Sequence, residues 1–243
     1  MIAEKPWRIE TVARLFLGIM AALWLAQFFG LALDSEKIPM SAEHRDLAKM
    51  ALGSIFLDGA VLACVGLFLR ENCLSWSEAF GLEKARQPQA VALGVLAALL
   101  FVPLELAWMA SAQLVLEHPV AQPLVEALQK TDLRLGEKAM MGALAVFLAP
   151  LAEEMVFRGI LYPTIKQAGF PRTAWWVTSL IFGAIHLNLV SFVPLTVFSL
   201  LLIWIYEKTG SLWASITAHS LFNFTSFAVL MFPSSLAPAT PLR

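Results

Sequence analysis

Long apolar segments recur along the whole chain, and they are the feature that most limits what it can fold into. A helix needs about 20 mostly apolar residues to cross the hydrocarbon core of a bilayer. Seven segments come near this length, although six to eight spans fit the sequence, and they cover residues 12–33, 51–69, 90–116, 139–165, 173–189, 190–206 and 211–231. The pattern predicts an all-α fold, namely a polytopic transmembrane helical bundle. The break near residue 189 depends only on Asn188 and Pro194.

The composition agrees with a membrane protein. Of the 243 residues, 59% are hydrophobic and 14% are charged, whereas a soluble domain carries roughly 25% charged residues. The net charge is −1, so the chain has no excess of positive charge to attract nucleic acid, and we expect no nucleic-acid partner. The first apolar run, 15–33, is longer than the roughly 7–15 residues of a signal-peptide core, and we expect it to remain as a membrane helix.

The polar connections carry weaker signals. Residues 117–138 have the pattern of an amphipathic helix that lies at the membrane interface or caps the bundle. With seven spans, nine Lys and Arg residues fall on the side of the N-terminus and seven on the other side. This small excess favours a cytoplasmic N-terminus.

Charged side chains inside predicted spans point to function, because each costs about 2.5–3.5 kcal/mol at the bilayer centre. The span 139–165 contains Glu153, Glu154 and Arg158. Glu154 and Arg158 are four residues apart and share one helix face, so we expect them to form an ion pair. Glu153 points about 100° away from that face. It lacks this local partner and is a candidate general base.

Two further polar pairs occur in later spans. Phe182 precedes His186 by four residues, and His219 precedes Asn223 by the same interval, so each pair shares a helix face. At about 1.5 Å per residue, Glu153 and His186 are both roughly 20 Å from the polar turn that joins their spans. His219 is roughly 14 Å deep from the same side. The sequence therefore predicts that three helices bring these groups to one intramembrane site.

Each of these residues also has a purely structural interpretation. A single buried histidine is more often a hydrogen-bonded core group than a catalyst, and Glu154 with Arg158 could be a structural ion pair. Asp58 and Glu105 are isolated within their spans, without a surrounding motif, and we expect them to be paired or solvated. The conjunction of two carboxylates, two histidines and an asparagine favours a functional site.

Taken together, the motifs resemble those of the CPBP family, which includes type II CAAX prenyl proteases and Abi-type or bacteriocin-processing proteins. The motifs are Glu-Glu-x-x-x-Arg at 153–158, Phe-x-x-x-His at 182–186 and His-x-x-x-Asn at 219–223. Flanking sequence agrees, with FRGILY at 157–162 and TGSLW at 209–213. No motif position departs from the family pattern.

The resemblance implies a division of the chain and a cellular location. Residues 1–89 would form two N-terminal transmembrane helices without a family signature, residues 90–231 a CPBP/Abi-like protease core, and residues 232–243 a C-terminal tail. The protein would be a multi-pass integral membrane protein of a prokaryotic plasma membrane. Its substrate would be a membrane-embedded peptide or a prenylated protein with a CAAX-type C-terminus.

The resemblance also implies an intramembrane endopeptidase and a role for each motif residue. Glu153 would activate a water shared with His186, and His219 and Asn223 would stabilise the oxyanion. The catalytic residues would thus be Glu153, Glu154, His186, His219 and Asn223, supported by Arg158 and Phe182.

Two alternatives stay open at the level of sequence. In a metal-dependent version, Glu153, His186 and His219 would bind zinc and leave one position open for water. In a different class of protein, the Glu/His cluster would be a relay that moves protons or a small solute. Inverted repeats, which are typical of many transporters, are absent from the sequence and count modestly against the second alternative.

Overall fold

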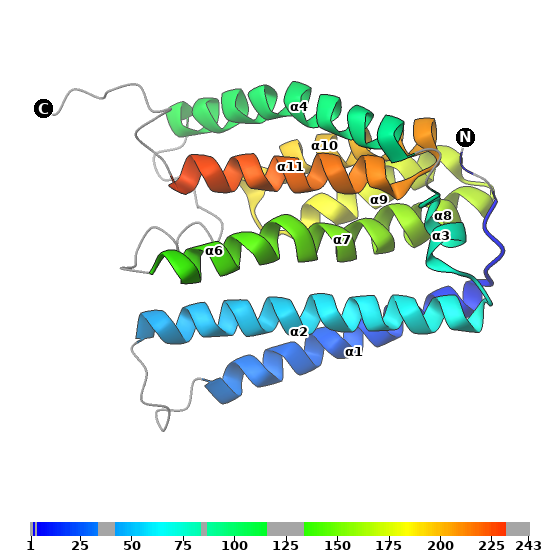
Figure 1. Cartoon of the computed structure of the whole chain (residues 1–243), viewed down its shortest axis with the longest axis horizontal. Helices are drawn as coiled ribbons and strands as arrows, with labels where there is room; N and C mark the ends of the chain where they lie inside the picture. The colour runs from blue at the N-terminus through cyan, green and yellow to red at the C-terminus, as the bar shows by residue number, and fades with distance from the viewer. Residues whose placement is uncertain (1, 3, 34–41, 84–86, 116–133, 232–243) are drawn as a thin grey trace, which may run out of the picture.

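The computed structural model describes residues 2, 4–33, 42–83, 87–115 and 134–231. Within these residues all regular secondary structure is helical, and the long helices lie side by side along one axis (Figure 1). The predicted all-α membrane bundle is confirmed. Most of the predicted amphipathic segment 117–138 and the whole C-terminal tail lie outside the described residues.

The helices follow the predicted apolar segments closely. The N-terminal half contains α1 (Ile9–Leu33), α2 (Ala42–Glu71), α3 (Trp76–Phe80) and α4 (Gln87–Val115). The C-terminal half contains one long helix at 135–167, followed by α9 (Pro171–Ala184), α10 (Leu189–Thr209) and α11 (Leu212–Met231).

The number of spans differs from the expected seven. Among the described residues, five helices are long and apolar enough to cross a membrane: α1, α2, α4, the helix at 135–167 and α10. Of the other two predicted spans, α9 has only 14 residues, about 21 Å at 1.5 Å per residue. The second, α11, has 20 residues but carries His219, Asn223 and several serines and threonines, which lower its mean hydropathy.

The long helix at 135–167 is not a uniform α-helix. It consists of α6 (Leu135–Ala143), the π-helical η2 (Leu144–Leu148), α7 (Ala149–Glu154), the π-helical η3 (Met155–Leu161) and α8 (Tyr162–Gln167). Prolines stand in the first turn of α7 and of α8. Wider turns of this kind are frequent at functional sites, and here they flank the two adjacent glutamates.

The corner between α9 and α10 differs from the sequence prediction. We expected a helix over 173–189 that carries His186, but α9 ends at Ala184 and His186 lies in the following turn. The chain leaves the helical direction at Leu187, whose φ of 51° is left-handed, and Asn188 then caps α10, its side chain accepting a hydrogen bond from the Ser191 N–H at 2.9 Å. Pro194, the other expected punctuation, lies inside α10.

The long helix at 135–167 lies between two groups of helices (Figure 1). It contacts α2 of the N-terminal pair α1–α2 on one side and α11 on the other, and α11 in turn packs along α4. The approach of α4 to α11 requires Gly94, because a Cβ atom there would lie 2.4 Å from the carbonyl oxygen of Ala214. This central position places Glu153 and Glu154 inside the bundle.

The segment before α1 is tied to one end of the bundle. The Lys5 amine donates to the carbonyl of Ala79 at 2.6 Å, and the indole N–H of Trp7 donates to the Thr164 hydroxyl at 3.0 Å. The Trp7 ring also packs edge-on against Phe68, with centroids 5.4 Å apart. Burial of the Lys5 amine lowers its pKa to about 8.

Candidate active site

Glu154 is the centre of the polar cluster and is completely buried. Its Oε1 atom accepts a hydrogen bond from Arg158 Nη1 at 2.7 Å and another from His219 Nδ1 at 2.9 Å. The ion pair expected from the four-residue spacing is confirmed, and the second bond reaches across to α11. One carboxylate therefore joins the first and third sequence motifs.

Arg158 is also completely buried, and its guanidinium lies over an aromatic ring. The Cζ atom is 4.3 Å from the ring centroid of Phe182, a favourable arrangement of a cation over a π face. Nε and Nη2 have no hydrogen-bond partner among the described residues. The charge of Arg158 is thus compensated by the Glu154 carboxylate and the Phe182 ring.

His219 is held in one orientation by its surroundings. Its ring packs edge-on against Phe182 and Phe198, at centroid distances of 5.6 and 5.8 Å. Because an ionised carboxylate only accepts hydrogen bonds, the Nδ1 atom that faces Glu154 must carry the proton. The free Nε2 atom is directed to the other side, 3.9 Å from Oε2 of Glu153.

Glu153 differs from its neighbour in being partly accessible. Its side chain is 25% exposed, and its buried Oε2 atom has no hydrogen-bond partner in the part of the chain that is described. This geometry agrees with the sequence prediction for Glu153, which does not share the local ion pair of Glu154 with Arg158. A carboxylate oxygen that is unpaired and lies near an imidazole nitrogen is suited to hold a water molecule.

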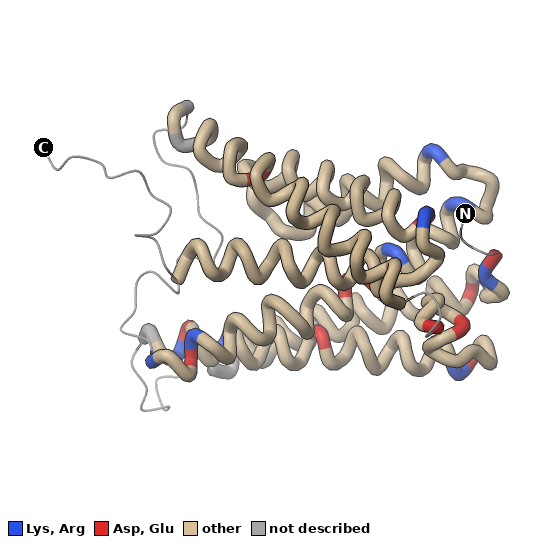
Figure 2. Tube along the Cα trace, turned by 45° about the horizontal axis from the view of Figure 1, so that its top comes forward, with Lys and Arg blue, Asp and Glu red and all other residues tan. Residues whose placement is uncertain are grey.

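A residue of the N-terminal helix pair also lies near this carboxylate. Asp58 of α2 is buried, accepts a hydrogen bond from the Ser54 hydroxyl at 2.8 Å, and interacts electrostatically with Glu153. Figure 2 shows most of the charged residues at the two ends of the bundle and a few acidic ones at mid-length. In the sequence, Asp58 was visible only as an isolated acid within a span, since no motif surrounds it.

His186 lies at the edge of the cluster. It is half-buried, and its Nδ1 atom donates to the carbonyl of Phe182 at 2.8 Å, which leaves Nε2 free. Its ring contacts Phe182 at a centroid distance of 5.1 Å. No hydrogen bond between His186 and Glu153 or His219 occurs in the described structure, so Phe182 is what connects the two histidines.

Asn223 follows His219 by one turn of α11 and is half-buried. Its Nδ2 atom donates to the backbone carbonyl of Ala145 at 2.8 Å, within the π-helical η2. The amide is therefore attached to the same long helix that carries Glu153 and Glu154. The third motif thus reaches the long helix at two points: His219 bonds to Glu154 of the first motif, and Asn223 bonds to Ala145 in η2.

The residues proposed as zinc ligands are not gathered around one point. Across the described ranges, no three His, Cys, Asp or Glu side chains lie close enough together to hold a metal ion. Glu153 and His219 approach each other, but His186 does not join them because it lies in the turn beyond α9 and is bonded to Phe182. The predicted set of Glu153, His186 and His219 therefore does not fit a metal site in this geometry.

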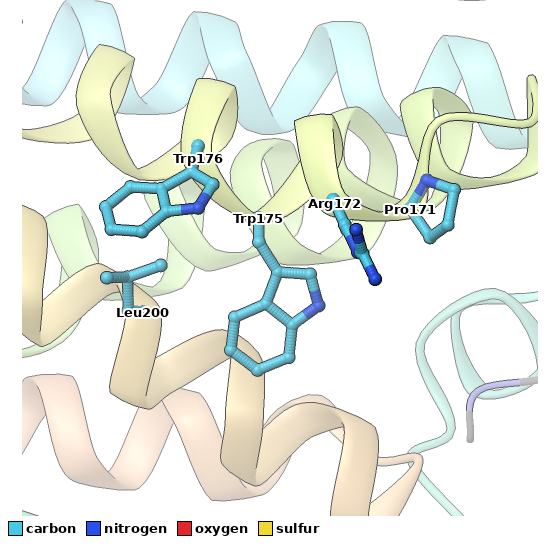
Figure 3. Close-up of a pocket in the computed structure, with 5 residues that line it drawn as sticks. All are labelled: Pro171, Arg172, Trp175, Trp176 and Leu200. Carbon is cyan, nitrogen blue, oxygen red and sulfur yellow. The ribbon is translucent and has the colours of Figure 1, made fainter.

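A separate pocket of about 470 Å³ opens on the surface between α9 and α10 (Figure 3). It is lined by Pro171, Arg172, Trp175, Trp176 and Leu200. None of these belongs to the three motifs, so this pocket is distinct from the Glu/His cluster.

Comparison with known proteins finds similarity within the C-terminal half of the chain. Residues 136–225 match the family of type II CAAX prenyl endopeptidase Rce1-like proteins. The predicted family resemblance is confirmed over these residues. They contain all three motifs and all seven predicted site residues, whereas Asp58 and Glu105 lie outside the match.

Two proteins of Bacillus subtilis (strain 168) are similar to parts of the chain. The uncharacterized protein YpbD is 39% identical over 80 residues, which cover 31% of this chain and 38% of YpbD. A protein named "Putative membrane peptidase YdiL" is 26% identical over 115 residues, which cover 47% of this chain and 43% of YdiL. The chain thus spans less than half the length of either relative. No solved structure matches it.

Proposed function

We propose that this protein is an intramembrane endopeptidase that hydrolyses a peptide bond with a water activated by Glu153. One observation carries the proposal: the Oε2 atom of Glu153, which has no hydrogen-bond partner among the described residues, lies 3.9 Å from Nε2 of His219, inside the helix bundle. A water molecule at ordinary hydrogen-bond distances of about 2.8 Å can bridge two atoms at this separation. Because Oε2 is buried, a small shift of the partly exposed Glu153 side chain would admit the water.

Each step of hydrolysis has a candidate residue. Glu153 takes a proton from the water as the oxygen attacks the peptide carbonyl carbon, and then transfers that proton to the leaving amine nitrogen. The oxyanion formed on the carbonyl oxygen accepts a hydrogen bond from the Asn223 amide, whereas Nε2 of His219, whose proton is on Nδ1, accepts a hydrogen bond from the water. His186 lies at the edge of the cluster, and we propose that it helps Glu153 hold the water only after its ring has moved toward that carboxylate.

Glu154 and Arg158 have a supporting role in this proposal. The Glu154 carboxylate fixes the tautomer and the orientation of His219, as a buried carboxylate does for the histidine of a catalytic triad. Arg158 and the ring of Phe182 hold Glu154 and the two histidines in place. We therefore expect changes at Glu154 to affect both folding and activity.

The comparisons support a proposal for the substrate class. The matched family is described as CAAX prenyl endopeptidases, and YdiL is named as a membrane peptidase. We propose that the substrate is a prenylated CAAX-type C-terminus or another membrane-associated peptide, which would reach the site from the bilayer.

The test uses the purified full chain in detergent, a farnesylated CAAX peptide and a helical membrane peptide. We expect the parent to cleave at least one of them, and Glu153→Gln to be inactive with an unchanged unfolding temperature, because an amide cannot take the proton of water. Glu137→Gln, in α6 of the same long helix but paired with His44 near its end, is the matched control and should cleave as the parent does.

Two outcomes would overturn the proposal. Cleavage by Glu153→Gln at the parental rate would remove Glu153 from the mechanism. A parent that cleaves neither peptide but acidifies loaded vesicles would favour a proton-moving protein.

A further inference from the structure

We infer that Pro150 and the π-helical η2 position Asn223 for catalysis, because together they leave the carbonyl of Ala145 free to accept its amide. This inference rests on the proposed role of Asn223 as a donor to the oxyanion. Pro150 and the Ala145 carbonyl would thus be positioning groups, although neither belongs to one of the three motifs.

The hydrogen bonds of η2 show how the free carbonyl arises. At the end of η2, the N–H of Ala149 bonds to the carbonyl of Leu144, five residues back. In the same register the next donor would be residue 150, directed at the carbonyl of Ala145. Residue 150 is proline and has no N–H. The Ala145 carbonyl accepts instead from Asn223 Nδ2, at 2.8 Å.

A carbonyl oxygen without a hydrogen bond inside a membrane bundle destabilises the fold, so a donor from a neighbouring helix stabilises it. Asn223 supplies this donor from α11, which packs directly on η2. The contact is close, because a Cβ atom on Gly142 would lie 2.7 Å from the ring of Phe227, one turn beyond Asn223. The asparagine is thus fixed against backbone rather than against another mobile side chain.

This arrangement leaves a defined donor for chemistry. A carboxamide has two N–H donors on one nitrogen. One is used by Ala145, so the direction of the other is set by the backbone of η2. Donors to an oxyanion are effective when they are held in place before charge develops, and small displacements of reacting groups cost large factors in rate. The π-helical turn therefore affects the rate of hydrolysis by fixing the direction of the second Asn223 N–H.

The experiment restores the missing N–H with Pro150→Ala and combines it with Asn223→Ala. Asn223→Ala should lower kcat by about 10²–10³-fold with little change in KM. Pro150→Ala should lower kcat by roughly tenfold, again with unchanged KM, because its new N–H competes with Asn223 for the Ala145 carbonyl. The double variant should be no slower than Asn223→Ala alone, since both changes act on the same donor.

The unfolding temperature separates this inference from a merely structural role. Pro150→Ala should unfold at the parental temperature or above it, because alanine adds a hydrogen bond to the helix. Asn223→Ala should lower the unfolding temperature in the parent and lower it less in the Pro150→Ala background. Pro103→Ala, which replaces an exposed proline inside α4, is the matched control and should keep the parental kcat.

Any one of three results would overturn the inference. The first is a parental kcat in Pro150→Ala, and the second is a double variant whose loss of kcat equals the product of the two single losses. The third is a fall in unfolding temperature on Asn223→Ala that is the same with Pro150 as with Ala at that position. If Pro150→Ala does not fold, Pro150→Ser supplies the same N–H and the same comparison. A parent without any peptidase activity refutes the proposed function and the catalytic part of this inference. The thermal comparison still decides whether Pro150 leaves Ala145 free for Asn223.

Discussion

Replacing Glu154 by glutamine should lower the unfolding temperature of the bundle markedly. Glu154 and Arg158 are both completely buried and are joined at 2.7 Å. Glutamine keeps the shape of the side chain but removes its charge. The guanidinium, whose Nε and Nη2 have no partner among the residues described, would then be buried without an opposite charge.

The size of the effect follows from this burial. Removing one partner of a buried ion pair costs about 3–5 kcal/mol. For a chain of this length, each kcal/mol lowers the unfolding temperature by about 2–4 °C, so we expect a fall of roughly 6–20 °C. The exposed pair of Arg14 and Glu71, at 3.0 Å with 61% and 45% of the side chains accessible, is the matched control. Glu71→Gln should cost only about 0–1 kcal/mol.

Thermal unfolding of both purified variants in one detergent, followed by tryptophan fluorescence, measures the difference. Glu154→Gln combined with Arg158→Met should recover part of the loss, because the unpaired charge is then removed as well. An unchanged unfolding temperature in Glu154→Gln would refute the reasoning. An equal fall in Glu71→Gln would show that burial does not determine the effect.

Three smaller perturbations test the edge of the site, the metal question and the N-terminal segment. His186→Phe should reduce turnover without lowering the unfolding temperature. If the unfolding temperature falls together with turnover, His186 has a structural role. Chelation should leave cleavage unchanged, because no three potential metal ligands lie close together in the described ranges, and a loss of cleavage that added zinc restores would contradict this. Lys5 has a pKa lowered from 10.5 to about 8 by burial, so the unfolded chain binds more protons between these values. Stability should therefore rise with pH over this window. Lys5→Met should abolish the rise, measured as unfolding temperature against pH, and an unchanged rise would implicate another group.

Local features of the structure could be predicted from the sequence. The apolar runs place the long helices because lipid requires that backbone groups bond within each segment. The pair of Glu154 and Arg158 depends only on helical spacing. His219 could likewise be placed near the depth of Glu153 by counting residues from polar turns on the same side of the bundle.

Features that depend on contacts between distant segments could not be predicted. The end of α9 is an exception, because its signal is local: the sequence marks Asn188 as a break but does not show that the helix ends before His186. The hydrogen bond from Asn223 to the carbonyl of Ala145 joins residues 78 positions apart in the sequence. Asp58 lies near Glu153 only because α2 packs against α7, which no local pattern encodes.

The ion pair of Glu154 and Arg158 has a consequence for biosynthesis. Both charges lie within a single turn of one helix, whereas His219, the other partner of Glu154, is translated 65 residues later. A lone charge would oppose transfer of this segment from the translocon into lipid by about 2.5–3.5 kcal/mol. Because the pair forms within the segment, the nascent helix can compensate both charges itself and enter the bilayer before α11 has been made. The residues that order the finished site thus also allow its central helix to be inserted.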